Sequence, residues 1–106
     1  MATAMVNIPE TAAPGEIVEI KILISHPMET GFRPGMDGKL LPRDIIRSLR
    51  CEYDGEIVFT AELHPAIAAN PFFVFHLRAD RSGEITLVWA DEKGNEFRQS
   101  GQIMVG

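Results

Sequence analysis

The single cysteine, Cys51, is the side chain in this sequence best suited to covalent chemistry, because a thiolate is a strong nucleophile. A reactive cysteine needs a nearby cation or a helix N-terminus to lower its pKa. Cys51 instead alternates with Leu49 and Tyr53, so we expect all three on the inward face of a strand, with Arg50 pointing to the opposite face. The pattern predicts a buried thiol that packs as a small apolar residue. A thiol carrier or enzyme that uses Cys51 directly is the alternative.

Three histidines, His26, His64 and His76, are the remaining candidates for a metal site. Blue-copper sites need two histidines and a cysteine, and no histidine lies within ten residues of Cys51. The hydrolase motif Gly-x-Ser-x-Gly is missing from the sequence. One cysteine also excludes an internal disulfide. We therefore predict no metal, no cofactor and no catalytic residues, so the chain is not expected to be an enzyme.

The least regular segment runs from His26 to Pro42 and is rich in proline and glycine, and the loop that it forms continues to Arg43. Its glycines follow a predicted strand but open no helix, so a phosphate-binding loop is not expected. Apolar residues nevertheless fall where water would meet them: Met28, Phe32, Met36, Leu40 and Leu41. These residue types favour a protein-binding surface. An Ω-loop that covers one end of its own domain is equally consistent with them.

Short alternating segments surround this loop and predict the strands that must position it. In the segment 16–25 every second residue is apolar and β-branched, which is the period of a half-buried strand. Asp54-Gly55 suits a type I′ hairpin turn, and we expect a bulge near Gly101 and one helical turn at 66–69. Further strands are predicted at 5–8, 45–53, 57–63, 72–79, 84–90 and 96–105.

About seven short strands with frequent turns predict an all-β fold, an immunoglobulin-like antiparallel β-sandwich. A small open barrel is the alternative. The 106 residues are the usual length of one domain, so we expect a single domain over residues 1–106.

The net charge of −5 makes nucleic acid an unexpected partner, because phosphate binding needs a basic patch. No apolar stretch approaches the 18 to 20 or so residues of a membrane-spanning helix. The first residues carry neither a basic segment nor an apolar one, so they do not read as a secretory signal. Taken alone, these features indicate a cytoplasmic protein that binds neither nucleic acid nor membrane.

Several distinctive runs of residues are spread over nearly the whole chain. The most specific of them is His26-Pro27-Met28-Glu29-Thr30-Gly31. The other runs are Gly-Glu-Ile-Val-Glu-Ile-Lys at 15–21, Asp-Gly-Lys at 37–39, Pro42-Arg43, Ala-Ile-Ala-Ala-Asn-Pro at 66–71, Ser82-Gly83 and Trp89-Ala90-Asp91. Together these runs resemble the SoxZ family.

This resemblance implies a scaffold subunit that forms a heterodimer with SoxY in thiosulfate oxidation. SoxY-like partners hold the covalent intermediates on a C-terminal Gly-Gly-Cys-Gly-Gly segment, while other Sox enzymes act on them. SoxZ-like chains have no leader and are thought to be exported folded with their partner, which implies the periplasm. Motif strength selects six residues as surface positions for partner binding: His26, Met28, Glu29, Gly31, Arg43 and Asn70.

Overall fold

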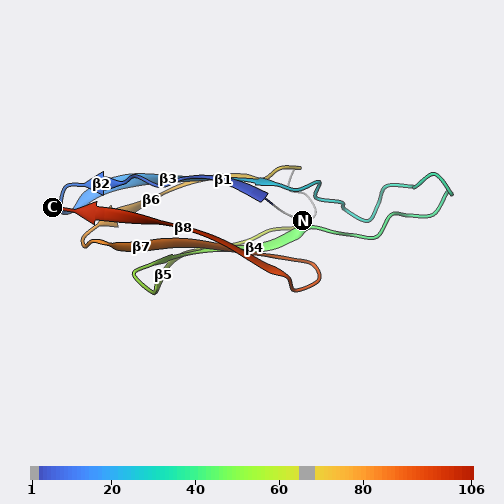
Figure 1. Cartoon of the computed structure of the whole chain (residues 1–106). Coiled ribbons are helices and arrows are strands. Elements are labelled where there is room, and N and C mark those ends of the chain that lie inside the picture. The colour runs from blue at the N-terminus through green and yellow to red at the C-terminus, as the bar shows by residue number, and fades with distance from the viewer. Residues whose placement is uncertain (1–2, 65–68) are drawn as a thin grey trace.

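The chain folds into two β-sheets packed face to face (Figure 1). The computed structural model describes residues 3–64 and 69–106. Within these residues all the regular structure is β. The strands are β1 (Thr3–Asn7), β2 (Thr11–Ala12), β3 (Glu16–Ser25), β4 (Ile46–Tyr53), β5 (Glu56–Glu62), β6 (Phe72–Ala79), β7 (Gly83–Asp91) and β8 (Glu96–Val105).

One sheet has the order β1-β3-β6 and the other has the order β2-β8-β7-β4-β5. All neighbouring strands are antiparallel except β2 and β8, which run parallel. The chain therefore changes sheet between β1 and β2. The predicted immunoglobulin-like sandwich is confirmed, and the open barrel is not formed. The two-residue strand β2 was not predicted, because two residues are too short to show alternation.

Alternating apolar side chains from both sheets fill the space between them. The inward residues of β3 and β4 are the ones predicted, and the thiol of Cys51 is among those fully buried. Burying each large aliphatic side chain contributes about 1.5–3 kcal/mol to the free energy of unfolding. Across the sandwich, the rings of Phe59 and Phe75 stack with centroids 4.2 Å apart. Other central core residues are Ile20, Ile22, Ile24, Leu49, Ile85, Leu87 and Ile103.

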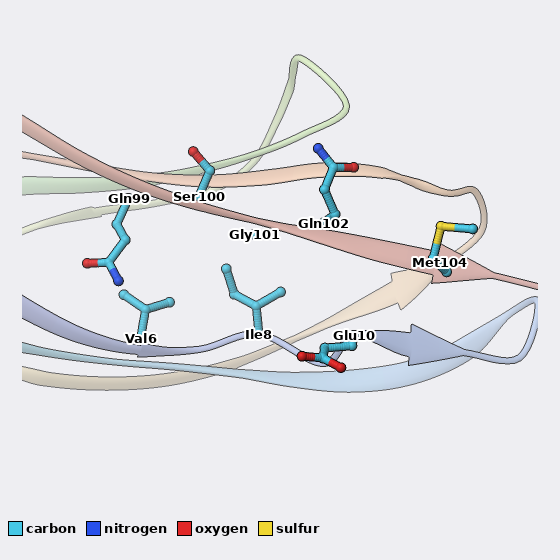
Figure 2. Close-up of a pocket in the computed structure, with 8 residues that line it drawn as sticks. All are labelled: Val6, Ile8, Glu10, Gln99, Ser100, Gly101, Gln102 and Met104. Carbon is cyan, nitrogen blue, oxygen red and sulfur yellow. The ribbon is translucent and has the colours of Figure 1, made fainter.

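The hairpin between β4 and β5 has the predicted turn. Asp54 and Gly55 have φ angles of +53° and +83°, which a type I′ turn requires at both central positions. The predicted bulge near Gly101 is wrong, because β7 and β8 pair without interruption through that position. Gly101 instead allows close approach: a Cβ there would lie 3.2 Å from Ile8 Cδ1, and Figure 2 shows Ile8 directed at this part of β8.

Irregular pairing occurs in β4 instead. The register shifts between Cys51 and Glu52 on the β5 side and between Ile46 and Ser48 on the β7 side. The predicted helical turn at 66–69 lies, apart from Ala69, outside the described residues. No helix that could cross a bilayer is found in the described part of the chain.

A long segment between β3 and β4, residues 26–45, leaves one end of the sandwich and returns to it. We call it the β3–β4 projection (Figure 1). Two isolated β-bridges, Glu29 with Asp44 and Pro34 with Leu40, hold its two halves side by side. The described chain is consequently elongated, with extents of 59 × 20 × 18 Å. Most of the projection stands clear of the sheets.

Candidate partner-binding surfaces

Cys51 is buried in the core, as predicted, and its surroundings suppress thiolate formation. Burial, with a smaller contribution from the charge of Glu52, raises the pKa of the Cys51 thiol from 9.0 to about 11. The nearest cation on the strand, Arg50, is committed to Glu52, with Nε 2.8 Å from Oε2. A protonated thiol without access to solvent is a poor nucleophile. The geometry therefore opposes direct thiol chemistry in the folded chain.

The three histidines lie in separate parts of the fold. His26 is at the base of the projection, His64 follows β5, and His76 is on the outer face of β6 with Nε2 3.6 Å from Glu19. Across residues 3–64 and 69–106, no three His, Cys, Asp or Glu side chains gather closely enough to hold a metal ion.

Met28 anchors the base of the projection in the core. Its side chain is only 4% exposed, and its Sδ accepts a hydrogen bond from the Ile46 N–H at 3.2 Å. Its φ angle of +53° lies in the left-handed region, which is uncommon for a residue with a Cβ. Such backbone strain persists only where the surroundings fix the residue. The burial and the sulfur hydrogen bond supply that constraint.

His26 and Asn70 fasten the projection to the segment that precedes β6. The Asn70 N–H donates to the His26 carbonyl oxygen at 2.7 Å, and Asn70 Oδ1 accepts from the His26 N–H at 3.0 Å. The His26 imidazole accepts from the Met28 N–H through Nδ1 at 3.0 Å. These bonds link two chain segments that are 44 residues apart.

Charged side chains brace the outside of the same base. Glu29 and Asp44 exchange two backbone hydrogen bonds of 2.8 Å, and the Glu29 carboxylate accepts from Arg33 Nη2 at 2.6 Å. Arg43 Nη2 donates to Glu92 at 3.0 Å, which ties the projection to the turn between β7 and β8. Hydrogen bonding to Arg33 is the main cause of a lowered pKa for Glu29.

The six residues selected from the sequence thus lie at the base of the projection, joined by shared contacts. Gly31, at φ +89°, leaves room for Arg43, whose Cβ would be 3.1 Å from a Cβ at position 31. The predicted surface position is wrong for His26 and Met28, which are 8% and 4% exposed. Their side chains satisfy backbone groups and fill the core, so both residues position the projection. Whether any of the six contacts a partner stays a prediction.

The far part of the projection exposes apolar side chains. Phe32 is 78% exposed, Met36 is fully exposed and Leu40 is 63% exposed. Each interpretation of this loop applies to a different part of it. Met28 covers the end of the sandwich core, as an Ω-loop would, whereas these three residues extend into solvent, as in a protein-binding surface. We call Phe32, Met36 and Leu40 the projection tip. Exposed methionine and phenylalanine are typical of protein-binding surfaces.

The outer face of the three-stranded sheet carries a second apolar surface. The register aligns Met5 with Leu23 and Leu23 with Phe72, so one row crosses all three strands. Met5 and Phe72 are exposed, and Val74 lies next to this row on β6. An open depression of about 460 Å³ borders the row beside Met5, Leu23 and Phe72. This surface was not predicted from the sequence, although the apolar residues on both faces of 16–25 and 72–79 are a signal for it.

The outer face of the five-stranded sheet has a different character. It carries ion pairs between Arg50 and Glu52, Arg50 and Glu96, and Arg98 and Glu96. At the side of the sandwich, β8 and the segment around Ile8 border a shallow opening of about 450 Å³ (Figure 2). Its lining mixes apolar and amide side chains with one carboxylate, Glu10, which provides no set of groups for acid–base catalysis.

The fold and these surfaces define a small immunoglobulin-like β-sandwich with two exposed apolar surfaces. The chain belongs to the SoxZ family, since the family model described as "Sulphur oxidation protein SoxZ" matches residues 6–102. A search of curated protein sequences gave no match.

Two solved structures show how widely this fold is shared. Superoxide reductase (neelaredoxin) from Ignicoccus hospitalis aligns with a TM-score of 0.74 and 16% identity, over 98% of this chain and 80% of that chain. The sulfur carrier protein SoxY from Chlorobium limicola f thiosulfatophilum aligns with a TM-score of 0.68 and 14% identity, over 97% of this chain and 78% of that chain. At identities this low, the two alignments show a common fold alone.

Titration of Cys51 should appear in the pH dependence of stability. The unfolded chain releases the thiol proton near pH 9 and the folded chain near pH 11, so the folded state holds the proton more tightly between these values. The protonated thiol should therefore contribute roughly 2–3 kcal/mol to the free energy of unfolding below pH 9, and this contribution should be lost as the pH rises to 11. Urea unfolding of the wild type and of Cys51→Ala at pH 8 and pH 11 measures the loss of stability in each protein, and the difference between the two losses is the contribution of the Cys51 thiol. Equal losses in the two proteins would contradict the burial argument.

Two methionines of the projection should differ sharply in their contribution to stability. Met28→Ala removes a buried side chain and leaves the Ile46 N–H without its acceptor, so we expect the free energy of unfolding to fall by about 2–5 kcal/mol. Met36→Ala, at a fully exposed position, should change it by less than about 0.5 kcal/mol. Thermal and urea unfolding measure both. Similar values for the two variants would show that Met28 does not anchor the projection.

Proposed function

We propose that this chain is the scaffold subunit of a SoxYZ carrier in thiosulfate oxidation and forms a heterodimer with SoxY. In this proposal SoxY holds the sulfur intermediates covalently on its C-terminal cysteine, and this chain catalyses no step. Membership of the SoxZ family supports a role in sulphur oxidation. The burial of the chain's one thiol is the observation that carries the finer assignment.

The physical argument concerns access. A carrier thiol must enter several active sites in turn, which a cysteine on a flexible glycine-rich segment can do. Cys51 is held in β4 between β5 and β7, opposite Phe59 and Leu87. Exposing it would require opening the core. This chain's contribution to the carrier is then the surface it offers to other proteins.

The projection is the part we assign to the other Sox enzymes. Its base is fixed to the sandwich by the His26–Asn70 and Arg43–Glu92 contacts, so the tip is held at a defined distance from the sheets. The tip residues are exposed and apolar. A rigid support with an adaptable apolar end suits contact with several enzymes in succession.

The periplasm is the compartment that this proposal requires. SoxY-type partners would supply the export signal, and the two subunits would cross the membrane together in folded form. Direct use of Cys51 as a carrier is the competing function, and no contact of Cys51 with the described residues favours it.

Complex formation and the location of bound sulfur test the assignment together. Co-expression with a SoxY partner should give a stable one-to-one complex by size-exclusion chromatography with light scattering. After turnover with thiosulfate and the Sox enzymes, intact-mass spectrometry should find sulfur adducts on SoxY and an unmodified Cys51. An adduct on Cys51, or a chain that stays monomeric beside SoxY, would overturn the proposal.

Polar substitution of the projection tip should affect the enzymes without affecting SoxY. Phe32→Ser combined with Met36→Ser removes apolar surface that makes no contribution to the core. We expect unchanged affinity for SoxY and a thiosulfate oxidation rate reduced by about tenfold or more in the reconstituted system. The matched control is Ile57→Ser, which removes an exposed apolar residue from β5. Equal rates for the control and the double variant would exclude the tip as an enzyme contact.

A further inference from the structure

The outer edge of β6 is a free sheet edge that the sandwich leaves open. β6 is the last strand of the three-stranded sheet, and no described strand pairs with its other side. At its start, the Pro71 carbonyl oxygen accepts from the Ile24 N–H at 2.9 Å. Hydrogen-bonded pairs alternate along an antiparallel ladder, so the inward residues Phe73, Phe75, Leu77 and Ala79 bond to β3.

The other residues of β6 consequently direct their backbone groups away from the sheet. These residues are Phe72, Val74, His76 and Arg78. Their N–H and C=O groups form a regular row along eight residues of uninterrupted register. Such a row is a template for one more strand.

The other edge strands of the sandwich differ from β6 in length, regularity or charge. β1, the other edge of the same sheet, has five residues, whereas β6 has eight. On β5 the register with β4 shifts at Cys51 and Glu52, and Glu56 and Glu62 end the strand with negative charges. On the opposite side, β2 pairs with the end of β8, and Ile8 packs against Gly101. Bulges, charges and covering segments are the usual protections of sheet edges. Within residues 3–64 and 69–106, the Phe72–Val74 end of β6 has no bulge, no charged side chain and no strand over its outer edge.

Side chains beside the β6 edge favour a protein strand as its occupant. Phe72 and Val74 are exposed and continue the apolar row of Met5 and Leu23. On the inner face, stacking of Phe75 on Phe59 keeps the strand in place. An incoming strand would therefore gain both backbone hydrogen bonds and apolar contact near Phe72.

We propose that SoxY docks here by adding one of its own edge strands to β6, which extends the three-stranded sheet across the heterodimer. This inference rests on the proposed function and names the surface it uses. SoxY from Chlorobium limicola shares the sandwich fold over 97% of this chain, and an open sandwich of this kind has edge strands that can pair with another chain. The charged outer face of the five-stranded sheet already pairs its charges internally and offers less to a partner.

Proline substitution tests the edge without removing a bond inside the sheet. Val74→Pro deletes an N–H that points away from β3, so the strand should still pair with β3. Thr60→Pro is the matched control on β5. The Leu63 N–H donates to the Arg47 carbonyl oxygen on the β4 side, and N–H groups point to opposite sides at successive residues of a strand. The Thr60 N–H, three residues earlier, therefore points away from β4. We expect Val74→Pro to weaken SoxY binding by about tenfold or more in titration calorimetry and Thr60→Pro to leave it unchanged.

Hydrogen exchange on the wild-type chain provides a measurement that no variant's folding can affect. The Val74 and His76 amides should exchange fast in the isolated chain and become protected when SoxY is added. If wild-type chain binds SoxY but these amides stay unprotected and Val74→Pro binds equally well, the β6 inference fails while the proposed function stands. Protection that arises from a second copy of this chain and persists without SoxY also overturns it. If the wild-type chain does not bind SoxY at all, the proposed function itself is contradicted.

Discussion

The two inner faces of the sandwich must be buried against each other, and this one requirement positions everything else in the molecule. Ile20, Leu49 and Leu87 are fully buried because each strand turns alternate side chains inward. The same alternation places Cys51 in the core, where desolvation keeps its thiol protonated. Cys51, which could have been reactive on the surface, therefore packs as a small apolar side chain. What remains for function is the set of backbone and apolar groups that the core does not use.

The base of the projection shows how motif residues can serve function indirectly. His26 and Met28 belong to the most distinctive run of the sequence, yet their side chains satisfy backbone N–H groups and fill the core. The strained backbone of Met28 is held by this packing, and Asn70 closes the same junction from another segment. The projection tip can be presented at a fixed position because these contacts make its base rigid.

Two subunits with the same fold can divide the work of carrying a reactive intermediate. The proposed SoxY partner contributes a mobile thiol, and this chain contributes a rigid surface with a projecting apolar tip and an open strand edge. Mobility and rigidity conflict within one short segment, because a cysteine fixed by sheet hydrogen bonds cannot visit several active sites. Placing the two properties on separate chains removes the conflict.

Local patterns in the sequence predicted every described strand except β2, together with the Asp54-Gly55 turn, the inward position of Cys51 and the fold class. Alternation and turn chemistry depend on neighbouring residues, so they can be recognised without the tertiary structure. The supposed bulge at Gly101 and the surface position of Met28 were wrong, because each depends on a residue distant in the chain, Ile8 and Ile46. Likewise, only the register of β1, β3 and β6 aligns Met5, Leu23 and Phe72 in one row. Sequence alone therefore determined which residues alternate, whereas the tertiary structure decided which edges stay open, since strand order arises from contacts between segments far apart in the chain.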